Sequence, residues 1–148
     1  MIEVRHCKLQ DLAALREIYL LARRDTFSWL DTSGYKLLDF DKHTEGESIF
    51  VASDQNILVG FASVWLQKNF IHLLYVHPRR LREGIGHQLL TTCLDVMDRP
   101  AKLKCLTRNQ NAVDFYLAIG WQITETAVGE DGEYFLMSLE KNLTKRCK

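Results

Sequence analysis

The chain has 148 residues, with 19 basic and 19 acidic side chains and therefore a formal net charge of zero. This length fits one domain with a substantial core, and the lack of a basic excess argues against a general binder of nucleic acid or anionic membranes. The four cysteines are widely spaced and include no Cys-x-x-Cys pair. They match neither a zinc site nor a disulfide framework, so we expect no metal.

The N-terminus runs Met-Ile-Glu-Val-Arg, without the apolar stretch of a signal peptide. No apolar run approaches the roughly 20 residues that a membrane-spanning helix needs. We therefore expect a cytoplasmic protein that does not enter a membrane. Residues 1–148 should form a single domain, with the polar and basic residues 141–148 as a flexible tail.

The first half of the chain predicts two helices and three strands. Alternation of apolar and polar residues marks strands, and apolar residues three and four apart mark helices. The expected elements are a strand at Ile2–Cys7, a helix at Asp11–Arg23, a short helix at Ser33–Leu38, an acidic loop at Asp39–Glu47 and strands at Ile49–Ser53 and Ile57–Gln67. Asp54, Gln55 and Asn56 separate the last two strands and are typical of a hairpin turn.

The second half alternates strands and helices. The expected elements are a strand at Phe70–His77, a helix at Ile85–Met97, a strand at Leu103–Leu106, a helix at Gln110–Ile119 with Val113, Tyr116 and Leu117 facing inward, and a hairpin of Trp121–Ala127 and Glu133–Leu139. We therefore predict an α/β fold: a mixed, mostly antiparallel central sheet of six to seven strands with about four helices on both faces. The two strands that flank the helix at Ile85–Met97 should be parallel.

Gly84 and Gly86 stand between an apolar strand and an amphipathic helix, in a loop that also carries three arginines. A strand, a glycine-rich loop and a helix N-terminus commonly bind phosphate, because the free N–H groups of the first helical turn and the positive end of the helix dipole attract the anion. The pair of glycines alone is weak evidence. It lacks the third glycine of the dinucleotide fingerprint and the Lys-Ser/Thr of a P-loop, and an ordinary tight turn is the alternative.

Two segments together resemble one family. Val76 to Leu90 contains Gly84-Ile85-Gly86 after a strand and is similar to the acyl-CoA-binding motif of the GNAT N-acetyltransferases, Arg/Gln-x-x-Gly-x-Gly/Ala. Asn109 to Trp121 resembles the family's Asn…Ala-x-x-Phe-Tyr-x-x-x-Gly-Phe/Trp. The order and spacing of the two segments, and the predicted strand order along essentially the whole chain, match this family.

The first motif departs from the family pattern at one position. Leu81 stands where the family has arginine or glutamine, and Arg82 occupies the next position, which is often glycine. Backbone N–H groups do most of the pyrophosphate binding in this motif, so the exchange need not abolish it. Arg80 or Arg82 could supply the missing charge.

The resemblance implies direct transfer of an acetyl group from acetyl-CoA, as co-substrate, to a primary amine of a small molecule or peptide. It assigns cofactor binding to Leu74, Tyr75 and Val76 along the pantetheine arm, to Arg82, Glu83, Gly84, Ile85, Gly86 and His87 at the pyrophosphate, and to Asn109 and Tyr116. One N–H group of the central strand would meet the thioester oxygen as negative charge develops.

The catalytic roles follow from position in the motif. Tyr116 corresponds to the general acid that protonates the CoA thiolate, since a phenol is protonated at neutral pH; its alternative role is that of a core aromatic. Asn109 can equally be the N-cap of the following helix. For the general base, Lys104 stands where some members carry glutamate, and we select His72 on the central strand because histidine titrates near neutrality.

The acceptor pocket has weaker support from the sequence. Its candidates are the aromatic residues Phe27, Trp29, Tyr35 and Trp65, with Asp39, Asp41 and Glu45 as acids that would attract an ammonium group. Packing in the core is the alternative for these aromatics. Nothing in the sequence selects the acceptor.

Two other functions stay open at this point. One is a non-catalytic acyl-CoA-binding sensor or partner module on the same fold. The other is a phosphate-ligand protein on an unrelated α/β fold, which would leave the second motif unexplained. For either catalytic or sensor function, we expect acetyl-CoA as a partner, with neither nucleic acid nor membrane, and a homodimer is one option because dimers are common in the family.

Overall fold

The structure is a computed structural model and describes residues 1–140. Its elements are β1 (Ile2–His6), α1 (Leu12–Thr26), α2 (Asp39–His43), β2 (Ser48–Asp54), β3 (Ile57–Trp65), β4 (Phe70–Val76), α3 (Ile85–Val96), β5 (Ala101–Leu106), α4 (Gln110–Ala118), β6 (Gln122–Gly129) and β7 (Gly132–Leu139). Short 3₁₀ turns are η1 (Leu9–Asp11), η2 (Leu66–Lys68) and η3 (Pro78–Arg80). This order confirms the predicted α/β fold.

The seven strands form one sheet in the order β1-β2-β3-β4-β5-β7-β6. Every neighbouring pair is antiparallel except β4 and β5, which are parallel as predicted. The β2–β3 turn contains Gln55 and Asn56 with φ angles of 51° and 69°. Positive φ at two successive turn residues matches the twist of an antiparallel hairpin, which confirms the predicted turn.

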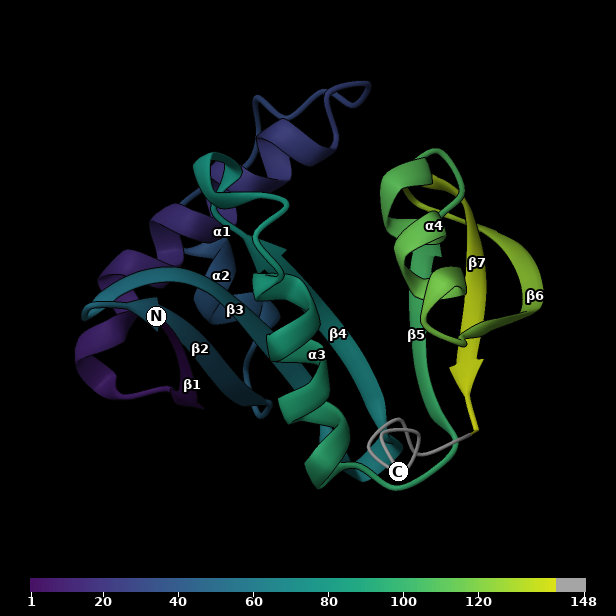
Figure 1. Cartoon of the computed structure of the whole chain (residues 1–148). Coiled ribbons are helices and arrows are strands. Elements are labelled where there is room, and N and C mark those ends of the chain that lie inside the picture. The colour runs from purple at the N-terminus through teal and green to yellow at the C-terminus, as the bar shows by residue number, and fades with distance from the viewer. Residues whose placement is uncertain (141–148) are drawn as a thin grey trace.

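The parallel pair β4 and β5 is very short. Only Phe70 with Lys102 and Ile71 with Leu103 are in register, and beyond them the two strands diverge (Figure 1). Past Ile71, the edge of β4 that faces β5 therefore has no strand partner. We refer to this divergence of the two strands as the fork.

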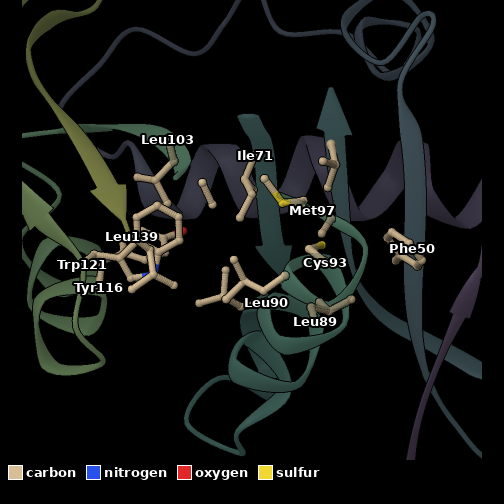
Figure 2. Packing of buried hydrophobic residues seen from close by; sticks show 14 of the residues in the cluster. Phe50, Ile71, Leu89, Leu90, Cys93, Met97, Leu103, Tyr116, Trp121 and Leu139 are labelled. Atoms are coloured by element: carbon tan, nitrogen blue, oxygen red, sulfur yellow. The ribbon is translucent and has the colours of Figure 1, made fainter. Parts of the chain in front are cut away.

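Helices cover both faces of the sheet, as predicted. On one face, α3 and α4 pack into a large apolar cluster, and Figure 2 shows Tyr116, Trp121 and Leu139 close together within it. On the other face, α1 and α2 pack over a smaller cluster made of Leu15, Ile18, Tyr19, Phe40, Val51, Phe61 and Leu73. In α4, Val113 and Tyr116 are buried as expected, whereas Leu117 is 43% exposed, so its predicted inward orientation is wrong.

The predicted short helix at Ser33–Leu38 is also wrong, because the helical turn starts at Asp39, immediately after the predicted segment ends, and forms α2. Phe40 is almost completely buried against α1, while Leu38 is 66% exposed, so burial favours the later position. The Asp39 carboxylate accepts a hydrogen bond from the Lys36 N–H at 2.9 Å, at the start of that turn. Part of the predicted acidic loop is thus helical.

Residues 141–148, the predicted tail, lie outside the described residues. Within residues 1–140, no helix is both long enough and apolar enough to cross a lipid bilayer.

Candidate functional site

The fork between β4 and β5 contains a cavity of about 980 Å³. Its walls are residues 25–29 at the end of α1 and just beyond it, residues 71–76 of β4, the loop that leads into α3, residues 103–106 of β5 and the start of α4. This volume lies within the range of roughly 300–1,000 Å³ that is typical of small-molecule and cofactor sites. The cavity exists because the two parallel strands pair at only two positions.

The glycine loop lines one end of this cavity. Gly84 is the N-cap of α3 with a φ angle of 80°, and no side chain caps the helix there. The first turn, which includes Gly86 and His87, also lines the cavity. Uncapped N–H groups at the positive end of a twelve-residue helix favour an anion such as phosphate.

The loop arginines differ in their pairing. Arg80 donates to Glu83 at 2.9–3.1 Å and to Asp54 at 2.8 Å, and these carboxylates raise its pKa. Within residues 1–140, Arg82 has no carboxylate partner, and it lines the cavity with a φ angle of 66°. Arg82, rather than Arg80, can therefore supply the charge that Leu81 lacks. Glu83 is not among the lining residues.

The unpaired edge of β4 continues from the loop. Leu74, Tyr75 and Val76 line the cavity on this edge, and on their other side they pair with β3. Gly60 makes that pairing possible, because a Cβ atom there would lie only 2.9 Å from the Tyr75 carbonyl oxygen. The predicted row of backbone groups is thus held in place by β3.

Tyr116 enters the cavity from α4 and is 8% exposed. Its ring contacts Phe115 and Trp121, with ring centroids 5.2 and 5.7 Å away. Burial raises the pKa of its phenol, and the nearby thiols of Cys105 and Cys93 add to this rise. The phenol is therefore protonated at neutral pH, as a proton donor must be. The predicted core packing and the predicted donor role are compatible.

Asn109 occupies the N-cap position of α4, but its side chain makes no capping hydrogen bond. Its main chain accepts from the Val113 N–H at 3.0 Å, so the backbone alone starts the helix. Asn109 lines the cavity, and its amide group is not used to cap the helix.

The two buried thiols are not nucleophiles. Burial raises the pKa of Cys105 to about 11 and that of Cys93 to about 12. Both are therefore protonated at neutral pH, whereas a nucleophilic cysteine acts as the thiolate. This agrees with their interpretation as core residues, although Cys105 also lines the cavity.

His72 lies at a β-bulge. Ser63 and Val64 of β3 are opposite Leu73 and Ile71, so His72 is an extra residue in β4. Bulges redirect a side chain, and the His72 Nδ1 atom lies 2.8 Å from a carboxylate oxygen of Glu47. The Ser63 hydroxyl donates to the same carboxylate. His72 lines the cavity, whereas Glu47 is not among the lining residues. The histidine is therefore oriented by a partner that lies outside the cavity.

Glu47 is the functional candidate that sequence reasoning missed. It lies 25 residues before His72 in the chain, within a segment that reads as an acidic loop. The carboxylate–histidine pair depends on the β4 bulge, for which the sequence carries no signal. One indirect signal exists in β3. Side chains alternate along a strand, so Ser63 lies on the same face as Phe61, and a polar residue on that face could have indicated a polar partner such as Glu47.

The aromatic candidates divide into two groups. Phe27 and Trp29 line the cavity, and the Arg108 guanidinium lies 5.1 Å from the Trp29 ring, so the loops after α1 and β5 meet across the fork. Tyr35 is not among the lining residues and instead packs on Arg23, whose guanidinium carbon lies 4.1 Å from the centroid of the Tyr35 ring. Trp65 is 45% exposed at the end of β3, also outside the lining.

The acids that were expected to attract an ammonium group also lie outside the lining residues. Asp39 pairs with Arg23 at 3.1 Å and Asp41 with Arg16 at 2.8 Å. Glu45 is exposed on the surface. Within residues 1–140, no group of three or more His, Cys, Asp or Glu side chains is placed to hold a metal ion.

The comparisons with known proteins agree with this geometry. The model of the acetyltransferase (GNAT) family matches residues 12–121, and the chain belongs to this family. No curated protein matches the sequence.

Solved structures of the same fold include the PaiA N-acetyltransferase of Thermoplasma acidophilum in complex with coenzyme A, with a TM-score of 0.78, 21% identity and coverage of 95% of this chain and 99% of that one. YncA of Salmonella typhimurium, a putative acetyltransferase with its cofactor acetyl-CoA, has a TM-score of 0.71 and 21% identity over 94% and 93% of the two chains. The ribosomal-protein-S18-alanine N-acetyltransferase of Escherichia coli has a TM-score of 0.73 and 18% identity over 95% and 94%. At these identities, the likeness establishes the fold.

Proposed function

We propose that this protein transfers an acetyl group from acetyl-CoA to a primary amine of a small molecule or peptide by direct attack. The observation that carries the proposal is the shared cavity, which brings the uncapped N-terminus of α3 together with Tyr116 and the Glu47-paired His72. An anion site, a proton donor and an oriented proton acceptor are the three features that this reaction requires.

The cavity has features that fit the cofactor. Its volume suits a ligand of this size, and the loop offers N–H groups together with the Arg82 guanidinium to a pyrophosphate. Leu74, Tyr75 and Val76 offer unpaired backbone groups to an extended pantetheine arm. When bound, acetyl-CoA would supply the activated thioester. Two solved structures of the same fold contain coenzyme A or acetyl-CoA, which supports this choice.

The two proton transfers take place on opposite faces of the sheet: a base accepts the amine proton on one face, and an acid protonates the thiolate on the other. Because the His72 Nδ1 atom is engaged by Glu47, its Nε2 atom is available to accept the amine proton. Tyr116 lies among the residues that pack with α3 and α4, on the opposite face, and donates its proton to the departing thiolate. An acid and a base on opposite sides of the fork allow the amine to approach from one face while the thiolate leaves on the other.

The proposed compartment is the cytoplasm. Among residues 1–140, Cys7, Cys93 and Cys105 are free thiols, as a reducing compartment favours. Residues 1–148 are proposed to act as a single acetyltransferase domain.

The test has two stages. A thermal-shift titration should show that acetyl-CoA raises the melting temperature, and an assay with a panel of amines should then release free CoA thiol. No stabilisation by acetyl-CoA would contradict the proposal. Stabilisation without thiol release across a broad panel would instead support the sensor function, in which the same fold holds acyl-CoA without turnover.

A further inference from the structure

The charges that line the cavity are mostly positive. Asp25 is the sole carboxylate among the lining residues, whereas four cationic side chains line it: Arg80, Arg82, Lys104 and Arg108. Arg80 is compensated by Glu83 and Asp54, and Arg82 belongs to the loop at the α3 N-terminus. Lys104 and Arg108 are left, on the side of the fork that carries β5, and neither has a carboxylate partner within residues 1–140.

The register of the strands places Lys104 beside the proposed base. Ile71 and Leu103 form the last in-register pair of β4 and β5, so His72 and Lys104 are the first residues of each strand beyond it. Leu103 and Cys105 both belong to the cluster under α3 and α4. Because side chains alternate along a strand, Lys104 points to the opposite face, which is also the face of His72, Glu47 and Ser63.

This position is the acceptor end of the cavity rather than the phosphate end. Lys104 is adjacent to Cys105, which packs in the same apolar cluster as Tyr116. The Lys104 ammonium lies 5.0 Å from the ring centroid of Tyr134, which carries no charge to balance it. A cation beside the reacting amine repels acceptors whose surroundings are cationic and attracts those with a nearby anion.

We propose that the acceptor carries a carboxylate close to its amine, as a free amino acid does, and that Lys104 binds that carboxylate. The proposal rests on the proposed function and names its substrate class. It disfavours polyamines, aminoglycosides and lysine side chains, which bring further positive charge or no anion. The Lys104 ammonium also favours the neutral amine over the ammonium form, and the neutral amine is the form that attacks.

The experiment measures thiol release with matched pairs of acceptors: glycine and glycinamide, phenylalanine and phenylalaninamide, and putrescine as a diamine. The amine of an amide is less basic than that of its amino acid, so simple reactivity at pH 8 would favour the amide. We expect kcat/KM to be at least about tenfold higher for the carboxylate member, since a charge-assisted contact distinguishes the two.

The variants assign this preference to one side chain. Lys104→Gln should reduce the carboxylate preference to near unity while the KM for acetyl-CoA stays within about twofold. Lys102→Gln is the matched control, because Lys102 lies on the same strand and face but outside the cavity lining. The inference is overturned if Lys104→Gln keeps the preference for the carboxylate acceptor. It is also overturned if Lys104→Gln changes only the KM for acetyl-CoA.

The outcomes also separate this inference from the proposed function. Thiol release that favours amides or putrescine overturns the substrate class and leaves the acetyltransferase intact. If no acceptor releases thiol, the proposed function fails, and calorimetric titration of the CoA-loaded protein with phenylalanine decides the inference. Binding that Lys104→Gln weakens at least tenfold and Lys102→Gln does not supports it, and an absence of binding overturns it.

Discussion

The two halves of the cavity are built in different ways. The half proposed for the cofactor consists of main chain: the loop at the N-terminus of α3 and the unpaired edge of β4. The half proposed for the acceptor consists of side chains from separate segments: His72 pairs with Glu47, which precedes β2, and Lys104 of β5 lines the same cavity. A main-chain site survives changes of side chain, as the exchange at Leu81 illustrates, whereas an acceptor site made of side chains can change its substrate with few substitutions.

The largest expected effect is at the proton donor, which lies between the two halves. Tyr116→Phe should lower kcat by about 100-fold or more, while the Kd for acetyl-CoA and the melting temperature change little because the ring still packs against Trp121. Steady-state kinetics and calorimetry measure these quantities. Unchanged turnover would remove Tyr116 from the mechanism.

The pH dependence of the wild-type protein provides a second readout of the same residue. Burial raises the pKa of the Tyr116 phenol, so the protonated form persists to higher pH than in a free tyrosine. The rate should therefore show no alkaline decline from loss of this proton below about pH 10, the ordinary value for tyrosine. A decline well below that pH that disappears in Tyr116→Phe would contradict the assignment.

The next largest effect tests the acceptor half. Glu47→Gln removes the carboxylate that orients His72, and we expect about a tenfold lower kcat with little change in the KM for acetyl-CoA. Glu45→Gln is the matched control, since Glu45 is a nearby exposed glutamate; equal losses in both variants would refute a specific role for Glu47.

A third change tests the main-chain half without altering any polar side chain. Gly60→Ala places a Cβ atom 2.9 Å from the Tyr75 carbonyl oxygen and 3.3 Å from Leu89, so β4 must shift. We expect a loss of about 1–3 kcal/mol in the free energy of unfolding and weaker acetyl-CoA binding. In the control Gly34→Ala, no atom lies within 4 Å of the new Cβ. Denaturant unfolding should show a clear difference between the two variants.

The last change concerns the loop arginine and should have an effect of similar size. Arg82→Gly should weaken acetyl-CoA binding by about tenfold through the loss of a charged contact. The same change should raise the free energy of unfolding by about 1 kcal/mol, because glycine adopts the positive φ of this position without strain. Arg79→Gly, at an exposed arginine outside the lining, should not change the Kd. If both variants weaken acetyl-CoA binding equally, the arginines attract the cofactor only through general positive charge, and Arg82 has no specific contact.

The contrast between the halves also explains what could be predicted from the sequence. The loop, the strand before it and the Asn109–Trp121 segment are contiguous in the chain, and their spacing indicated the fold and the cavity wall. Glu47 and Lys104 acquire their neighbours only through the β4 bulge and the register of β4 with β5. The short helix was misplaced because the burial of Phe40, which decides its position, is a tertiary contact.

Amide chemical shifts measured while acetyl-CoA is titrated into the isotope-labelled protein test the central claim most directly. The largest changes should fall on residues 73–76, 82–87 and 109, with little change along β1, which lies at the far edge of the sheet. Saturable changes confined to those residues are the predicted result. If acetyl-CoA binds and those residues do not shift, the cofactor lies elsewhere and the division of the cavity described above is wrong.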